Sequence, residues 1–139
     1  MGLVTASSIK FNLRALDRVI GYYVYDNQDR DVAPIQELLV DSETRQPRYV
    51  IIEIGGMMSI RGKKALIPWA ALTKAGMSRM NVNCPAEQII ASPTPRAPLA
   101  PTKPEEETLH WYYNVEPYWL GAELEAPAQE KEGNNGGEK

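Results

Sequence analysis

The chain has 139 residues, a formal net charge of −3, one cysteine and one histidine. This length suits one small domain with appendages. A single cysteine excludes an internal disulfide and a cysteine-based metal site, and it favours a reducing, cytoplasmic compartment. No apolar run reaches the roughly 18 residues of a spanning helix, and the first residues lack a signal-peptide pattern. We therefore expect a cytoplasmic protein that reaches the inner membrane only peripherally, through a partner.

The charge is uneven along the chain. Residues 1–14 carry +2, residues 15–91 are neutral, and residues 92–139 carry −5. Proteins that bind nucleic acids need clustered Lys and Arg side chains for the phosphates. The balance therefore argues against DNA as a partner and disfavours RNA.

The first half of the chain predicts strands joined by polar turns. Residues 1–14 form a polar arm. Val19 to Tyr25 is rich in β-branched and aromatic residues and predicts the first strand. Val32 to Val40 predicts the second strand, where Pro34 requires a strand start, an edge or a bulge because it has no N–H group.

The third predicted strand, Arg48 to Ile54, has one wholly aliphatic face and one mixed face. Val50, Ile52 and Ile54 alternate with the residues of the mixed face. This alternation is typical of a sheet with one dry side.

Five further segments follow a glycine pair at residues 55 and 56. We expect a loop over 57–64, a fourth strand over 65–69, one helical turn over 70–76, a fifth strand over 77–84 and a short closing helix over 85–91. Five short strands with local turns favour a small all-β barrel, which removes exposed edges. The predicted core includes Leu39, Val50, Ile52, Ile54, Ile67 and Trp69, with an interface role as the alternative for Trp69.

The composition changes after residue 91. Residues 92–108 predict a proline-rich linker, with five prolines between residues 92 and 104. Residues 109–125 form an aromatic segment that holds two of the three tryptophans and three of the seven tyrosines. Residues 126–139 are acidic and glycine-rich, which predicts a disordered tail.

The order of several short motifs resembles the PRC-barrel domain over roughly residues 15–91. These motifs are Val19-Ile-Gly21, the Val-Tyr-Asp turn at 24–26, Glu37-Leu-Leu-Val-Asp41, Arg48-Tyr-Val-Ile-Ile52, Gly55-Gly56 and Ile67-Pro-Trp69. One departure is at Ala33 or Pro34, where the family usually has glycine. The resemblance implies a barrel of about five to six strands with a short C-terminal helix, followed here by the proline-rich, aromatic tail.

The PRC-barrel resemblance also implies a function. The domain occurs in the cytoplasmic part of the reaction-centre H subunit and in the C-terminal half of a ribosome maturation factor. It implies a docking module with no enzyme activity or cofactor of its own. Neither specific role transfers intact, because this chain shows neither the anchor helix of the first nor the preceding domain of the second.

Two clusters and one strand residue are candidate partner-binding sites. Aromatic side chains beyond the proline-rich linker are costly to leave in water. They can cover the barrel of their own chain, swap onto a second copy or bind another protein. The second cluster is basic and is either a solvated loop or a contact for an acidic surface. The candidates are Trp111, Tyr112, Tyr113, Tyr118, Trp119, Tyr22, Arg61, Lys63 and Lys64.

Catalytic and metal sites are not predicted. His110 has no cysteine or histidine companions, and zinc sites need three or four ligands. Asp26, Asp29 and Asp31 lack the glycine and terminal glutamate of a calcium loop. No residue lies in a recognisable nucleophile motif.

Three hypotheses for the function remain open. The first is an adaptor that binds a protein partner, with a membrane-bound complex resembling the reaction centre among the candidates. The second is an accessory factor in RNA processing or ribosome assembly. The third is a structural protein that self-assembles as a homodimer through its aromatic tail.

Overall fold

The computed structural model describes residues 2–12, 17–55 and 62–120, and the side chains of residues 10–12 are not described. In these ranges a seven-stranded sheet is the main element. Its strands are β1 (Leu3–Thr5), β2 (Tyr23–Tyr25), β3 (Asp31–Asp41), β4 (Pro47–Ile54), β5 (Lys63–Pro68), β6 (Leu72–Lys74) and β7 (Arg79–Val82). The helical elements are η1 (Ala6–Asn12), η3 (Trp69–Ala71), α1 (Ala86–Ile90) and α2 (Lys103–Tyr112).

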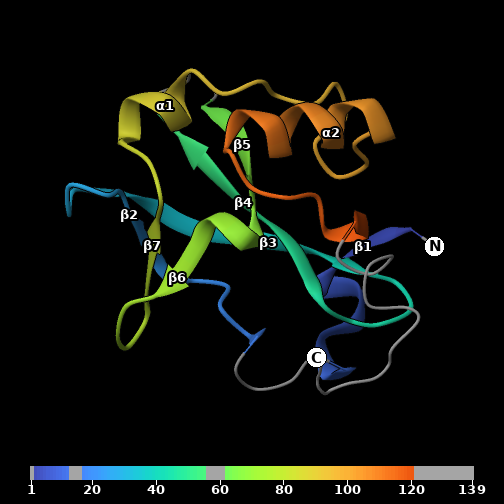
Figure 1. The fold of residues 1–139 in the computed structure, drawn as a ribbon. Coiled ribbons are helices and arrows are strands. Elements are labelled where there is room, and N and C mark those ends of the chain that lie inside the picture. The colour runs from blue at the N-terminus through green and yellow to red at the C-terminus, as the bar shows by residue number, and fades with distance from the viewer. Residues whose placement is uncertain (1, 13–16, 56–61, 121–139) are drawn as a thin grey trace, which may run out of the picture.

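The sheet curls around a shared core. The strand order is β5-β4-β3-β2-β7-β6, and β1 pairs with β3 outside this path. Neighbouring strands are antiparallel except β2 and β7, which are parallel. Both α1 and α2 lie on the same side of the sheet (Figure 1). The predicted small all-β barrel with a short helix after the last strand is confirmed.

Four of the six predicted core residues are fully buried: Leu39, Val50, Ile52 and Ile67. Ile54 and Trp69 are half-buried and pack against the core. Burying aliphatic side chains of this size contributes about 1.5–3 kcal/mol each, so these strands supply much of the stability of the fold.

The prediction that only one face of the sheet is buried is wrong for β4. Tyr49 and Ile51, which belong to its mixed face, are as deeply buried as Val50 and Ile52. Tyr49 is covered by side chains of α2, to which its hydroxyl is hydrogen-bonded. The pattern in β4 could not reveal this second cover, because the cover comes from a segment more than fifty residues later.

The N-terminal segment is more structured than a polar arm. Leu3 of β1 pairs with Asp41 at the end of β3, and η1 follows with Ala6 buried. Both β1 and β2 can pair with the long strand β3, because β2 pairs with its first residues and β1 with its last. Pro34 lies just before Ile35, where the pairing of β3 with β4 begins, so its missing N–H leaves that ladder intact.

Two other expectations need correction. The predicted helical turn over 70–76 is divided between η3 and the strand β6, which pairs with β7. The predicted linker over 92–108 does not stay extended, because α2 begins at Lys103. Pro104 is tolerated there because N–H groups in the first helical turn have no partner within the helix.

Candidate functional site

Helix α2 has a defined signal at each end. At its start, the Thr102 hydroxyl accepts a hydrogen bond from Glu105 N, while Glu105 Oε1 accepts one from Thr102 N, which is a capping box. At its end, Asn114 takes the left-handed conformation with a φ of 59°. Asn114 N donates to the carbonyl of Trp111, and Val115 N donates to that of His110, as in a Schellman motif. The helix is therefore fixed at both ends, which sets the direction of each side chain on it.

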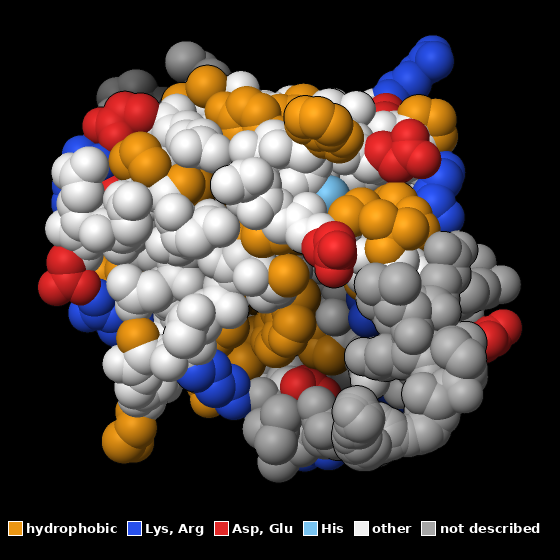
Figure 2. All heavy atoms as spheres, viewed as in Figure 1, with side chains coloured by type: hydrophobic (Ala, Val, Ile, Leu, Met, Phe, Trp, Pro, Cys, Tyr) orange, Lys and Arg blue, Asp and Glu red, His pale blue; other side chains and the backbone are white. Residues whose placement is uncertain are grey.

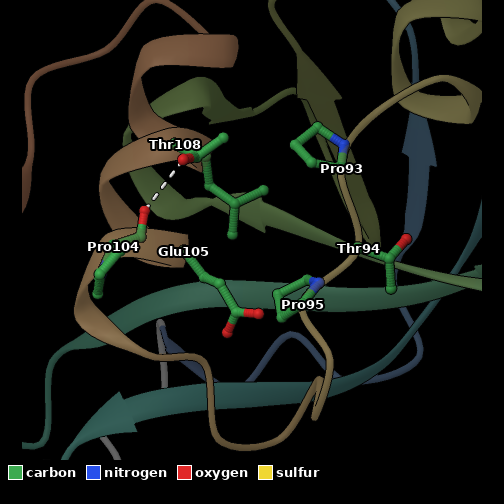
Figure 3. Close-up of a pocket in the computed structure, with 7 residues that line it drawn as sticks. Pro93, Thr94, Pro95, Pro104, Glu105 and Thr108 are labelled. Carbon is green, nitrogen blue, oxygen red and sulfur yellow. Dashed lines mark hydrogen bonds between the residues drawn. The ribbon is translucent and has the colours of Figure 1, made fainter.

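The proline-rich segment packs beside the first turns of α2. A shallow pocket of about 170 Å³ lies between Pro93, Thr94 and Pro95 on one side and residues of α2 on the other. Figure 3 shows Pro95 facing Glu105, and the Thr108 hydroxyl donates to the Pro104 carbonyl within the helix. The prolines thus lead the chain from α1 to α2 along the surface of the same domain.

The inner face of α2 is buried against the sheet. Its buried residues are Glu106, Leu109 and His110, and Tyr113 continues the same stripe. Glu106 Oε1 accepts a hydrogen bond of 2.8 Å from the Tyr49 hydroxyl. Burial, together with the neighbouring Glu106 carboxylate, raises the pKa of Tyr49 well above its usual range, so Tyr49 acts as a proton donor here.

The chain returns over α2 after residue 115. Tyr118 donates a second hydrogen bond, of 2.6 Å, to Glu106 Oε1. The Arg48 guanidinium lies 4.4 Å from the centre of the Tyr118 ring. The ring of Trp119 packs edge-on against His110, with 5.3 Å between ring centres. We call Val115 to Leu120 the return loop; it closes over the buried carboxylate of Glu106.

The ring of His110 is part of this packing. Its Nδ1 lies 2.8 Å from the carbonyl of Glu106, one helical turn earlier, so this nitrogen carries the proton. Burial lowers the pKa of His110, which keeps the ring neutral. Across the residues that the structure describes, no group of three potential ligands is arranged to hold a metal ion.

The outer face of α2 is different. Trp111 is 84% exposed, whereas neighbouring Tyr113 is buried. Beside Trp111 is a hollow of about 370 Å³ lined also by Val115, Pro117 and Leu120. Hydrophobic side chains gather on this side of the molecule, over α2 (Figure 2). An exposed tryptophan next to an apolar hollow is typical of an interface residue.

The structure separates the predicted aromatic cluster into two groups. Tyr113, Tyr118 and Trp119 pack on their own chain, and the Tyr112 hydroxyl donates to the carbonyl of Gln88. Of the five aromatic residues in this cluster, only Trp111 has a side chain that is mostly exposed to solvent. This division follows from the helix, since residue 111 lies opposite the stripe formed by residues 106, 109, 110 and 113.

The other predicted binding residues are also engaged within the chain. Tyr22 is half-buried and packs against the core. Lys63 Nζ donates to the carbonyls of Ile90 and Ser92, and Lys64 Nζ is 3.4 Å from Glu53. Arg61 lies outside the described residues. Lys63 therefore ties the end of α1 to β5, and a free basic cluster is not formed by these two lysines.

Sequence reasoning did not single out Glu106. A signal was present, because Glu106, Leu109, His110 and Tyr113 follow the i, i+3, i+4, i+7 spacing of a buried helical face. The proline-rich composition before Glu106 masked that periodicity.

The curled sheet, with a short helix after its last strand, defines a small β-barrel domain, and the sequence comparison agrees. A family model for the PRC-barrel domain matches residues 11–89, which is more than half of the chain. The chain belongs to the PRC-barrel family. No curated protein matches it. In the described ranges, no helix is both long and apolar enough to cross a membrane.

Proposed function

We propose that this chain is a non-enzymatic PRC-barrel adaptor that binds a protein partner through the outer face of α2. We define this docking face by Trp111, Val115, Pro117 and Leu120. The observation that carries the proposal is the exposure of Trp111 on a helix whose other aromatic neighbours are packed. Tryptophan is enriched among the residues that dominate binding energy at interfaces.

The surroundings of Trp111 support a specific interface. The hollow beside it offers a concave apolar surface for a side chain of the partner. The helix that bears Trp111 is capped at both ends, so little order has to be gained on binding. A rigid anchor beside a preformed hollow favours recognition of a folded partner.

Affinity capture from the native host tests the proposal. The full chain is compared with Trp111→Ala and with Met77→Ala, a matched control because Met77 is 96% exposed on the hairpin between β6 and β7. The soluble fraction and the detergent-extracted membrane fraction are captured separately, because a membrane-bound complex is the finer form of the proposal. Nuclease treatment separates protein contacts from RNA contacts.

We expect a defined partner that resists nuclease and is lost with Trp111→Ala but kept with Met77→Ala. Removing an interface hot spot costs about 2 kcal/mol or more, or roughly a 30-fold loss of affinity. Equal recovery of the partner with both variants would show that the docking face does not bind it. Recovery of the partner only when RNA is intact would contradict the adaptor role and would indicate a factor that acts in a ribonucleoprotein.

A further inference from the structure

Five separate segments of the chain meet around a second hollow, away from the docking face. It has a volume of about 370 Å³ and lies where β1, the end of β3, the proline-rich segment, α2 and the return loop converge. This volume is in the range of small-molecule sites. Its charged and aromatic lining residues are Asp41, Lys103, Glu106, Tyr118 and Trp119.

Glu106 gives the hollow a buried negative charge. The residue is only 7% exposed, and both of its described side-chain hydrogen bonds, from Tyr49 and Tyr118, go to Oε1. Among the residues that the structure describes, Oε2 accepts no hydrogen bond, and it is not one of the fully enclosed side-chain atoms that lack a partner, so it is open to the hollow. A carboxylate oxygen that faces a partly enclosed hollow attracts a cation more strongly than one in open water, because the local dielectric is lower.

Asp41 is a second carboxylate on the wall, but it is already paired. Its Oδ1 accepts hydrogen bonds from Glu43 N and Thr44 N, and its Oδ2 lies 3.6 Å from Arg48. Asp41 therefore needs no ligand, and Oε2 of Glu106 is the carboxylate oxygen on this wall that remains open to one.

The ammonium group of Lys103 already contacts the aromatic part of the hollow. Lys103 Nζ lies 4.2 Å from the centre of a Trp119 ring. Lys103 makes no ion pair within the described ranges, and its side chain is exposed, so it can move into water at little cost. A tryptophan face attracts cations most strongly among the aromatic rings. Lys103 thus occupies the position that an external ammonium group would take.

The start of α2 does not turn this hollow into an anion site. Glu105 N is bonded to the Thr102 hydroxyl, and Glu106 N is bonded to the Thr102 carbonyl. These first-turn N–H groups are therefore not available to an anion.

We propose that this hollow binds an alkylammonium group, which displaces Lys103 from Trp119 and pairs with Glu106 Oε2. The site is independent of the docking face around Trp111. The same chemistry is presented by a free quaternary amine and by a methylated lysine side chain of another protein.

Titrations followed by NMR on the full chain test the proposal. Choline is compared with 3,3-dimethyl-1-butanol, its uncharged isostere, and the indole N–H signals of Trp119 and Trp111 are recorded. We expect choline to shift the Trp119 signal with a dissociation constant on the order of 1 mM, and the isostere to bind at least about tenfold more weakly. A peptide carrying trimethyllysine assigns the natural source: tighter binding than choline indicates a protein-borne cation, and weaker binding a free amine.

Three variants sharpen the test. Glu106→Gln keeps an oxygen acceptor for both tyrosines but removes the charge, and we expect at least about a tenfold loss of choline affinity. Lys103→Met removes the internal competitor, and we expect tighter binding. Trp111→Ala is the control and should leave choline binding unchanged. Equal shifts with choline and its isostere, weaker binding to Lys103→Met, or no shift up to tens of millimolar would each overturn the proposal.

Discussion

Glu106 joins the barrel to the segment that follows it. Its Oε1 accepts hydrogen bonds from Tyr49 of β4 and from Tyr118 of the return loop. Truncation of this residue leaves the buried Tyr49 hydroxyl and the half-buried Tyr118 hydroxyl without this acceptor. Because an unsatisfied buried polar group costs about 1–3 kcal/mol, we expect Glu106→Ala to lower the free energy of unfolding by about 2 kcal/mol or more. Urea denaturation measures the change.

Glu107 provides the matched control for this prediction. It neighbours Glu106 on the same helix but is exposed, so Glu107→Ala should change stability by less than about 0.5 kcal/mol. Equal effects of the two substitutions would show that the network around Glu106 does not stabilise the fold.

Asp26 predicts how stability depends on pH. Burial alone would raise its pKa, but hydrogen bonds from the backbone of Arg30 and Ala86 and from the Arg30 side chain lower it to about 2, from 3.8. A group with a lowered folded-state pKa stabilises the fold above its unfolded value and loses this contribution as pH falls. We therefore expect the free energy of unfolding to decrease as pH falls from about 4 to about 2.

Chemical denaturation at a series of pH values measures this loss. Asp26→Asn should flatten the acid dependence in that window, whereas Asp31→Asn, at an exposed position, should leave it in place. An unchanged slope in Asp26→Asn would show that other carboxylates cause the acid sensitivity.

At the scale of elements, the capping box decides where α2 begins. Thr102→Ala removes the acceptor for Glu105 N, and such a loss costs typically about 1 kcal/mol. We expect the midpoint of urea unfolding to fall accordingly. Thr102→Ser keeps the hydroxyl and should retain nearly all of the stability. If both variants behave like the parent, the cap does not contribute to holding α2 in place.

The strands were largely predictable, while the cover over them was not. Alternation and turn residues indicated five of the strands, and Val50, Ile52 and Ile67 are buried as expected. The parallel pairing of β2 with β7 depends on long-range packing, which no local pattern encodes. The start of α2 was missed because the prolines before Thr102 outweighed a capping box that was present in the sequence.

The candidate site was predicted only in part. The concentration of aromatic residues indicated an important segment, and Trp111 was among the residues proposed. Which of these side chains faces the barrel depends on the helical phase of α2. That phase is fixed by contacts such as Tyr49 with Glu106, between residues 57 positions apart.

At the scale of the whole molecule, residues 103–120 are part of the domain. They bury Leu109 and Tyr113 and cover Tyr49 on β4. We expect a chain ending at residue 102 to lose at least about 3 kcal/mol of stability, because two large side chains leave the core. It should also bind a dye specific for exposed hydrophobic surface. A chain ending at residue 120 is the control and should unfold like the full chain.

The most direct test of the account is whether the return loop packs on the barrel of its own chain. The centres of the Tyr49 and Tyr118 rings are 6.2 Å apart, close enough for nuclear Overhauser effects between their ring protons. In a mixture of isotope-labelled and unlabelled protein, we predict that these effects arise only within one molecule. Their absence, or their appearance only between differently labelled molecules, would contradict the account.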